Sequence, residues 1–580
     1  MTTLDAAITA TLARLDEENF PARLWKRDPT LWKTEPEHQR IIEKSLGWLT
    51  VPRAMLGQVD ELLKFVEEVR HEGYKHAVVL GMGGSSLCPD VCRATFGTAP
   101  GYLELHVLDS TVPSCVARVA KAADPATTLY LVSSKSGGTV ETLSFYKYFR
   151  SLVEGAKGER AGENFVAITD PGTSLERLAR EQRFRRVFHG QPDIGGRYSA
   201  LSNFGMVPAA LAGVDVRALL ARAGEMAQAC GPEVRSRENP GVALGAVLGE
   251  AARAGRDKLT FVMSPGFYTF ADWVEQLVAE STGKEGKGLV PVVREHLESP
   301  EAYGHDRLFV HMKLASETNK KVEGMLRNLE RAGHLVMRIE LADRHDVGRE
   351  FFRWEVATAT AGALLGINPF DQPNVQESKD NTNRLLAQFA AQGGFEEEAH
   401  LAESEGVKFY CDAARRTGSS GTMGAGAPAP MEDCLAAFLA QRQPGDYLAL
   451  LAYLDPTSGH RAALQAIRMS LRNGLGVATT SGIGPRYLHS TGQLHKGGAA
   501  NGLFMIVTGD DRTDLPVPGE PYSFSVLKQA QALGDLQSLR SRNLRVVRFH
   551  LGKSVQAGLD HLLIVVKAAL NKLAEARGSA

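Results

Sequence analysis

The sequence predicts an α/β protein built on two doubly wound parallel sheets, because short β-branched runs alternate with longer helical patterns. The first series of such runs is HAVVLGM, LELHVLDS, TLYLVSSKS and NFVAITD, at residues 76–82, 103–110, 128–136 and 164–170. Strands separated by helices form βαβ units, and right-handed crossovers place the helices on both faces of the sheet. We therefore expect one parallel sheet in the first third of the chain.

A second series of strand-like runs follows a helical stretch near residues 209–256. Its members are at 258–264, 307–312, 333–341, 447–455, 476–482, 502–509 and 544–551. Two consecutive series favour two domains of the same architecture.

The expected domains are bounded by changes in composition. We predict a helical N-terminal wrap at 1–55, a first domain at 56–215, a second domain at 216–414, and its continuation at 431–580 with a C-terminal helix. Between the last two lies RRTGSSGTMGAGAPAP at 415–430, whose Gly, Ser, Ala and Pro cannot pack a core, so it reads as a linker. For 385–445 we predict no more than a helix and this linker.

The composition is that of a globular protein with no dominant charge. Of the 580 residues, 43% are hydrophobic and 23% are charged, which allows a large core. Lys and Arg number 66 and Asp and Glu number 67, so the net charge is −1. This balance predicts no nucleic-acid partner and no polybasic membrane surface, and an anionic substrate would need local cations.

The cysteines and the N-terminus indicate a reduced compartment. Of the six cysteines only Cys88 and Cys92 are close in sequence, and none form a CxxC pair, which favours free thiols over a disulfide or a metal site. The first residues carry acids where a signal peptide is basic, and no apolar run reaches the length of about 18 residues that a membrane span requires. We expect a cytoplasmic protein.

Two loops rich in glycine and hydroxyl groups follow strands of the first series. VVLGMGGSSL contains Gly84 and Ser85 and has neither the dinucleotide nor the Walker A spacing, so a tight turn explains it equally well. LVSSKSGGTVET contains a second set of polar residues: Ser134, Lys135, Ser136 and Thr139. Helix capping would also explain those hydroxyls. Because two such loops converge at the carboxyl edge of one sheet, a phosphate site is the better interpretation.

The segment FADWVEQLVAESTGK at 270–284 predicts an amphipathic helix. Gln276 and Glu280 lie on its polar column, which could be no more than a solvated face. The helix breaks directly after Glu280, however, in Ser-Thr-Gly. A carboxylate beside such a loop can be a general base.

Three further segments carry candidate cationic or titratable groups. RYLHSTGQLHKGG holds His489 and His495 in a polar loop, where histidine titrates near neutrality. INPFDQPNVQESK places Lys379 at a helix start. IGGRYSALSNFG places Arg197 after two glycines, either as a surface residue of a turn or as a fixed cation beside developing negative charge.

Together these segments resemble the phosphoglucose isomerase family of two-domain sugar isomerases. The motifs that carry the resemblance are GMGGSSL, SSKSGGTVET, GGRYSALSNFG, QLVAESTGK, FDQPNVQESK and LHSTGQ, and they cover most of residues 50–380 and 475–510. The first sixty residues and the C-terminal portion also look like the isomerase half of transaldolase–phosphoglucose isomerase fusion proteins. The chain has no room for a complete transaldolase barrel of about 250 residues beside both domains.

The resemblance implies two sugar-isomerase domains that interconvert glucose 6-phosphate and fructose 6-phosphate, in glycolysis and gluconeogenesis, through a cis-enediol. It implies no metal, no cofactor and a homodimer. Glu280 would move the proton between C2 and C1, Arg197 would stabilise the intermediate, and His489 with Lys379 would open the sugar ring. The phosphate would be held by Ser134, Lys135, Ser136 and Thr139, while Gly84, Ser85, Gln276 and Gln372 would contact the sugar.

One departure from the family pattern leaves two assignments open. In the family the histidine motif follows the glutamate motif closely, but here His489 comes more than 200 residues after Glu280 and beyond the lysine motif. His305 in AYGHDR is the alternative ring-opening histidine, and Lys528 in YSFSVLKQAQALG is the alternative lysine.

Rival functions also remain at this point. They are a non-catalytic regulator that binds sugar phosphate through the same fold, and an isomerase that acts on mannose 6-phosphate or an amino sugar. The missing N-terminal Cys nucleophile disfavours glutamine-dependent amination. The missing GxGxxG spacing disfavours a nicotinamide oxidoreductase.

Overall fold

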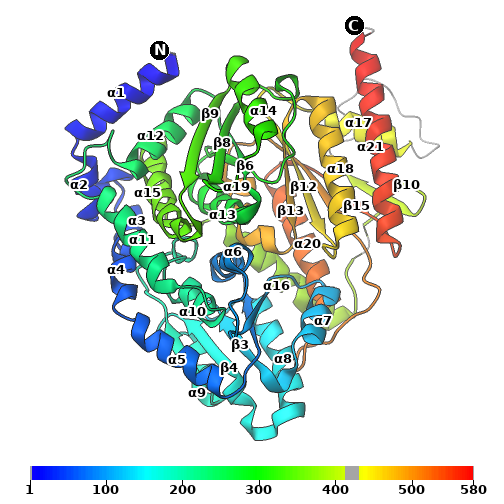
Figure 1. The fold of residues 1–580 in the computed structure, drawn as a ribbon. Helices are drawn as coiled ribbons and strands as arrows, with labels where there is room; N and C mark the ends of the chain where they lie inside the picture. Colours follow the sequence, from blue (N-terminus) through cyan, green and yellow to red (C-terminus); the bar gives the residue numbers. More distant parts are fainter. Residues whose placement is uncertain (1–2, 397, 412–429, 579–580) are drawn as a thin grey trace.

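The computed structural model describes residues 3–396, 398–411 and 430–578, and its strands form three sheets (Figure 1). Every run that was expected to be a strand contains one, which confirms a mixed α/β fold with parallel sheets. Four short strands were not predicted: β5 (Arg186–His189), β7 (Val290–Val292), β10 (Ala402–Ser404) and β11 (Val407–Cys411). The predicted linker at 415–430 lies, apart from Pro430, outside the described residues.

The first sheet is entirely parallel and has the strand order β2-β1-β3-β4-β5. The strands that precede β5 are β1 (His76–Gly81), β2 (Glu104–Leu108), β3 (Thr128–Ser133) and β4 (Phe165–Thr169). The helices after these strands are α6 (Leu87–Phe96), α7 (Pro113–Ala122), α8 (Val140–Lys157), α9 (Ser174–Glu181) and α10 (Asn203–Leu211). The order of connection reverses between β1 and β3, so the polar loops after these two strands border the crevice where ligands of such sheets bind.

The second series of strands belongs to two sheets. The four-stranded sheet is parallel, with the order β7-β6-β8-β9, and its longer strands are β6 (Lys258–Met263), β8 (Arg307–Leu314) and β9 (Leu335–Leu341). The six-stranded sheet has the order β10-β11-β15-β14-β12-β13. Its parallel strands are β12 (Tyr447–Tyr453), β13 (Ala478–Ile483), β14 (Gly502–Thr508) and β15 (Arg545–His550), and the β10–β11 hairpin adds to β15 in antiparallel orientation.

A buried arginine joins these two sheets. Arg468 donates to the carbonyl of Val293, directly after β7, at 2.9 Å and to the carbonyl of Thr479 in β13. An arginine with five donors can satisfy backbone carbonyls of two sheet edges at once. The two sheets therefore meet at their β7 and β13 edges.

The remaining helices come after α10 along the chain. Those that follow the first sheet are α11 (Val216–Ala229), α12 (Pro240–Arg253), α13 (Phe270–Thr282), α14 (Lys320–Arg331), α15 (Val347–Leu365) and α16 (Val375–Gln392). Those of the last third are α17 (Met431–Leu439), α18 (Ser458–Leu475), α19 (Gly492–Gly497), α20 (Phe524–Ser541) and α21 (Val555–Gly578).

The N-terminal helices run along one side of the molecule (Figure 1). They are α1 (Thr3–Glu17), α2 (Phe20–Trp25), α3 (Pro36–Glu43), α4 (Val51–Leu56) and α5 (Val59–His71). Two tryptophan indoles fasten this segment: Trp25 donates to the carbonyl of Cys230 at 2.7 Å and Trp32 donates to the carbonyl of Ala359 at 2.8 Å. Because a buried indole N–H needs an acceptor, these bonds fix where the segment packs.

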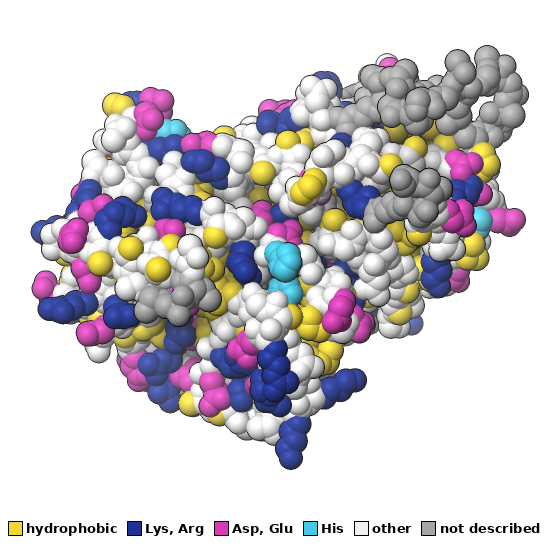
Figure 2. Space-filling view, turned by 90° about the horizontal axis from the view of Figure 1, so that it is seen from above, with side chains coloured by type: hydrophobic (Ala, Val, Ile, Leu, Met, Phe, Trp, Pro, Cys, Tyr) yellow, Lys and Arg dark blue, Asp and Glu magenta, His cyan; other side chains and the backbone are white. Residues whose placement is uncertain are grey.

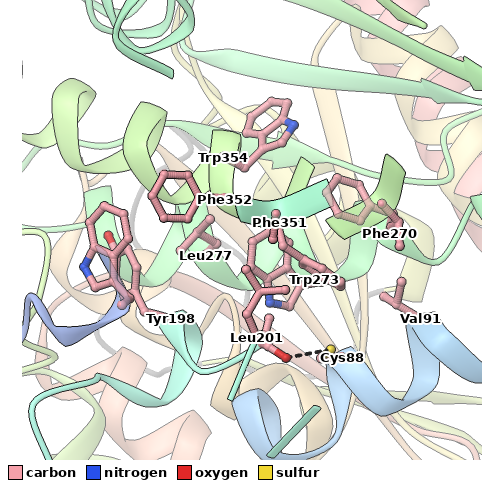
Figure 3. Packing of buried hydrophobic residues seen from close by; sticks show 14 of the residues in the cluster. Cys88, Val91, Tyr198, Leu201, Phe270, Trp273, Leu277, Phe351, Phe352 and Trp354 are labelled. Carbon is pink, nitrogen blue, oxygen red and sulfur yellow. Dashed lines mark hydrogen bonds between the residues drawn. The ribbon is translucent and has the colours of Figure 1, made fainter. Parts of the chain in front are cut away.

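The largest core cluster lies around α13 and α15 (Figure 3). Trp273 meets Phe351 edge to face, with ring centroids 4.7 Å apart. Gln276, on the expected polar column, is also buried. The interpretation of that column as a solvated face is therefore wrong, because both the apolar and the polar side of α13 contain buried residues.

The outer surface mixes both signs of charge. On the face shown in Figure 2, basic and acidic side chains are interspersed, and neither sign forms a continuous stripe there. Within the described residues, no helix combines the length and the apolar composition that crossing a bilayer requires.

Three backbone segments meet at the turn after β1. A Cβ atom on Gly84 would lie 2.0 Å from the carbonyl oxygen of Gly196, and one on Gly83 would lie 2.9 Å from the carbonyl oxygen of His489. Gly83 also has a φ of +55°, in the left-handed region that favours glycine. The glycines of this turn therefore permit contact with the loops after β5 and β13.

Gly84→Ala tests this packing. The added methyl group meets backbone rather than a movable side chain, so we expect a loss of stability of at least the about 1–3 kcal/mol typical of an overpacked core. The melting temperature should fall by several degrees in a thermal shift assay. Gly224→Ala is the matched control, since nothing lies within 4 Å of its Cβ position in α11 and its melting temperature should stay level or rise. Equal melting temperatures for both variants and the parent would contradict the close approach.

Candidate functional site

A cavity lies where the loop after β3, the start of α16 and the loop after β13 come together. The polar residues that line it include Ser136, Thr139, Glu141, Lys379, His489 and Gln531. Four of these, Ser136, Thr139, Lys379 and His489, are predicted site residues. The fold thus brings together side chains from the first domain and from two distant parts of the second half.

His489 is oriented by a buried carboxylate. Its Nε2 lies 2.8 Å from Oε1 of Glu141, in the first turn of α8. Gln531 donates to the same oxygen at 2.7 Å and accepts a hydrogen bond from Thr111 at 2.8 Å, which fixes the direction of the amide. Since a carboxylate only accepts hydrogen bonds, Nε2 carries the proton. Nδ1 has no hydrogen-bond partner among the described residues and is free to exchange a proton with a ligand.

The Glu141–His489 pair is electrostatically stabilised. Burial raises the pKa of the Glu141 carboxyl, but the charge of His489 and its hydrogen bond outweigh burial and hold that pKa below its usual range. The charge of Lys379 acts in the same direction. Glu141 therefore remains ionised at neutral pH.

The second histidine of this loop has a structural role. His495 is buried against Phe504, with ring centroids 5.1 Å apart. Burial lowers its pKa to about 3, so it stays neutral at physiological pH. Of the two histidines in RYLHSTGQLHKGG, His489 is the one in the cavity.

Glu280 lies in the last turn of α13 and is connected to His489 through Gln276. The Gln276 amide donates to the Glu280 carboxylate at 3.0 Å and to the carbonyl of His489 at 2.7 Å. Nη1 of Arg197 lies 3.4 Å from Oε1 of Glu280. The carboxylate, the guanidinium and the histidine loop thus form one connected group.

Arg197 is almost completely buried, with an exposed fraction of 2%. Its guanidinium donates to Ser281 at 2.7 Å, to the carbonyl of Pro369 at 2.7 Å and to the side chain of Gln372 at 3.0 Å. The interpretation of a surface arginine in a turn is therefore wrong. The planar fork fixes α13 and the FDQP segment relative to each other.

Lys284, which was not predicted as a site residue, binds residues 368–371 of the segment that Arg197 also contacts. It is buried, donates to the carbonyl of Asn368 at 2.7 Å and pairs with Asp371 at 2.8 Å. Burial, followed by the neighbouring charge of Arg197, lowers the pKa of Lys284 to about 7. The ammonium group of Lys284, whose pKa lies near neutral pH, is therefore paired with Asp371, the residue before Gln372.

The loop after β3 has the features of an anion site. Thr139 precedes α8, whose N-terminal N–H groups and dipole favour negative charge. Ser136 is exposed to the cavity, while the buried Ser134 hydroxyl bonds to that of Thr139 at 2.9 Å. Lys379 reaches the same cavity and has no ion-pair partner within the described part of the chain. These groups can hold a phosphate through hydroxyls, backbone amides and one ammonium.

The predicted site residues that do not line the cavity are Glu280, Arg197, Gly84, Ser85, Ser134, Lys135, Gln276 and Gln372. Glu280, Arg197, Gln276 and Gln372 belong to the connected group described above, and Ser134 bonds to Thr139. Lys135 forms an ion pair with Asp170 instead. Gly84 lies against the backbone of Gly196, and Ser85 is buried in the same turn. Their positions are explained by packing and ion pairing within the first domain, so the cavity gives them no contact with a ligand.

The two alternative residues are elsewhere. His305 lines a separate cavity with Asp306 and residues 442–446, and its ring lies 6.3 Å from that of His334. Lys528 donates to the carbonyl of Gly509 and pairs with Asp511 at 2.7 Å. Neither lines the cavity that His489 and Lys379 share. A second lysine, Lys496, also lines that cavity, but it is paired with the buried Asp535 at 2.6 Å.

Sequence reasoning overlooked the residues that support His489. Glu141 stands within SSKSGGTVET, for which only the hydroxyls and Lys135 were predicted to contact a ligand, although an acid in the first turn of a helix that follows such a loop is a detectable signal. Gln531 lies in an otherwise ordinary helix, and no sequence pattern distinguishes it.

The arrangement suits proton transfer on a phosphorylated ligand. A carboxylate beside a fixed guanidinium can act as a base at carbon while the guanidinium stabilises the charge that develops. A histidine held by a carboxylate can protonate an oxygen of the same ligand. An anion site about the helix terminus would hold the ligand between them.

Comparison with known proteins identifies the family. The family model described as phosphoglucose isomerase matches residues 54–295. The glucose-6-phosphate isomerase of Carboxydothermus hydrogenoformans is 30% identical over 411 residues, which are 61% of this chain and 86% of that protein. The glucose-6-phosphate isomerase of Rubrobacter xylanophilus is 29% identical over 386 residues, which are 58% of this chain and 88% of that protein.

A solved structure agrees with this assignment at the level of the fold. A hypothetical protein of Thermus thermophilus superposes with a TM-score of 0.57 at 25% identity, covering 67% of this chain and 99% of that one. A relative at 30% identity that is covered over 86% of its length is sufficient to assign a family. The chain therefore belongs to the phosphoglucose isomerase family.

Proposed function

We propose that this protein interconverts glucose 6-phosphate and fructose 6-phosphate by proton transfer through an enediol. The curated relatives are named glucose-6-phosphate isomerase. The observation that carries the proposal is the bridge made by Gln276, whose amide donates both to Glu280 and to the backbone of His489. It joins the side chain of the proposed carbon base to the backbone of the proposed ring-opening acid.

Binding begins with the phosphate in this proposal. The hydroxyls of Ser136 and Thr139 and the N-terminus of α8 accept it, with Lys379 as the counter-charge. The phosphate then anchors one end of the sugar, so that the remaining hydroxyls orient against Gln276 and Gln372. Positioning of this kind supplies much of the rate because both catalytic groups are already in place.

Ring opening comes next. His489 gives a proton to the ring oxygen as the bond between C1 and that oxygen breaks, and the C1 hydroxyl passes its proton to water, so that C1 becomes the carbonyl carbon. Glu141 stabilises the protonated imidazole through the 2.8 Å hydrogen bond. The open-chain aldehyde then has its C2 hydrogen acidified by the adjacent carbonyl.

The isomerisation step is a proton transfer between neighbouring carbons. The Glu280 carboxylate takes the proton from C2, and the C–H electron pair forms the C1–C2 double bond of an enediolate. Arg197, 3.4 Å from the Glu280 carboxylate, stabilises the negative charge that develops on oxygen. The proton of the C2 hydroxyl passes to the oxygen on C1, and Glu280 returns its own proton to C1, which gives the ketose. No electron acceptor enters the balance.

The biological setting that we propose follows from the family. The reaction belongs to glycolysis and gluconeogenesis, and we propose a cytoplasmic homodimer. The charge balance of 66 basic and 67 acidic residues supports a small-molecule substrate over a nucleic acid.

A coupled assay tests the function. Purified protein with fructose 6-phosphate, glucose-6-phosphate dehydrogenase and EDTA should show steady NADPH formation that scales with protein concentration. Mannose 6-phosphate in place of fructose 6-phosphate, with product analysed directly, tests the neighbouring isomerase activity. No turnover, together with a melting temperature that still rises with fructose 6-phosphate, would favour the regulator over the enzyme.

Glu280→Gln tests the base. The amide keeps the size and the hydrogen bond from Gln276 but cannot take a proton, so kcat should fall by about 10²–10⁴-fold. A phosphorylated sugar acid should still raise the melting temperature. Glu285→Gln, beyond the end of the same helix and in an exposed ion pair with Lys33, is the control and should keep its rate. Undiminished turnover in Glu280→Gln would remove Glu280 from this role.

His489→Ala tests ring opening by comparing two substrates. Turnover of the cyclic hexose phosphate should fall by about 10²-fold or more. Turnover of an acyclic analogue such as erythrose 4-phosphate, whose chain cannot close a ring, should fall far less. Equal losses on both substrates would argue that His489 supports the site without opening the ring.

A further inference from the structure

A second cluster of functional side chains lies at the opposite end of β1 from the catalytic loops. His76 begins β1, Glu104 begins β2 and His106 follows two residues later. The parallel register pairs His76 with Glu104 and Val78 with His106. Since directly opposed residues and those two positions along share one face of a sheet, the three side chains lie together on one face.

The three donor groups lie close together. Nδ1 of His76 is 3.3 Å from Nε2 of His106, and the Glu104 carboxylate oxygens lie 3.4 Å and 3.8 Å from these nitrogens. The ligand atoms of the group all lie within 4.8 Å of one another. Zinc with tetrahedral geometry and bonds of about 2.0–2.1 Å separates its ligands by about 3.3–3.4 Å. The His76–His106 and His76–Glu104 separations of 3.3 Å and 3.4 Å fit that spacing, and rotation of the exposed Glu104 side chain would bring the carboxylate closer to His106, which is 3.8 Å away.

The geometry points to a divalent zinc site formed by His76, His106 and Glu104, with its fourth position open to water. Two imidazoles and one carboxylate are a donor set that zinc prefers, whereas calcium and magnesium require several oxygens.

The scaffold supports such a site without rearrangement of the backbone. Both histidines come from hydrogen-bonded strands, and their side chains are about four-fifths buried, with 19% exposed. The Glu104 side chain is 60% exposed and can close on the ion. Rigid strands fix ligand directions more closely than loops do.

The site would fasten the edge of the first sheet. β2 is the outermost strand of the order β2-β1-β3-β4-β5, and a zinc ion would connect it to β1 independently of the ladder hydrogen bonds. β1 separates the cluster from the Gly83 turn by roughly 17 Å at about 3.3 Å per residue. The ion is therefore stabilising and is no part of the isomerase chemistry.

Zinc titration of the full-length protein tests this site. After EDTA treatment and removal of the chelator, isothermal titration with zinc chloride should give one ion per chain with a dissociation constant in the micromolar range or below. The melting temperature should rise with zinc because the ion binds only the folded state. Turnover of fructose 6-phosphate should be the same with and without zinc.

Variants locate the bound ion. Glu104→Gln changes an exposed side chain, so it should fold normally and weaken zinc binding by about 10-fold or more. His76→Gln combined with His106→Gln should abolish it, and melting in EDTA reports whether this variant is folded. His400→Gln is the matched control, because His400 has a carboxylate partner, Glu403, at 3.2 Å, and no cluster of three metal-ligating groups includes it among the residues that the structure describes.

Two results would overturn the proposal. One is the absence of stoichiometric zinc binding by the parent protein. The other is unchanged binding by both Glu104→Gln and the double histidine variant, which would place the ion elsewhere. Loss of turnover on zinc removal would contradict the separation from the catalytic site.

Discussion

The close approach of three backbone segments at Gly83 and Gly84 is the constraint on which the rest of the site depends. The turn after β1 touches the loop after β5 through Gly196 and the loop after β13 through His489. A side chain at either glycine would separate these loops. Because they carry Arg197 and His489, the lack of two Cβ atoms fixes the spacing of the two residues that we propose as the stabilising cation and the ring-opening acid. Glycine here serves the approach of protein backbone, where the sequence suggested the approach of an anion.

Hydrogen bonds between polar side chains connect the segments that the glycines allow to approach one another. Gln276 connects Glu280 to the loop that carries His489, and Glu141 connects that loop to α8, where we propose that phosphate binds. Buried polar networks of this kind are costly unless every member is satisfied, and their members hold one another in single orientations. The network also explains how a histidine more than 200 residues from Glu280 in sequence can serve the same substrate. The order of motifs along the chain is different from the family pattern, while the relative placement of the side chains suits the same chemistry.

Local sequence patterns predicted the helices and strands. They did not predict side-chain burial or the division of the strands among sheets, because both depend on contacts between residues distant in sequence. The strands of HAVVLGM and TLYLVSS and the helix that carries Glu280 follow from periodicity, and the family motifs led to His489 and Lys379 in preference to His305 and Lys528. The burial of Arg197 and Lys284 could not be predicted from local sequence. It depends on the backbone carbonyls of Pro369 and Asn368, which are distant from both residues in sequence. The division of the second half into two sheets depends on the edge contact made by Arg468. The His76, Glu104 and His106 cluster is invisible as a motif because strand register, and not sequence spacing, brings its members together.

The central claim is that Glu280 moves a proton between two carbons of a sugar phosphate. Its most direct test is isomerisation of fructose 6-phosphate in deuterium oxide, with deuterium at C2 of the glucose 6-phosphate measured by NMR during the first turnovers. A carboxylic acid exchanges its proton with solvent, so the account predicts solvent deuterium at C2 in at least part of the first product. Product that forms at the full rate and contains no solvent deuterium at C2 would indicate a hydride shift between the carbons and would contradict the account.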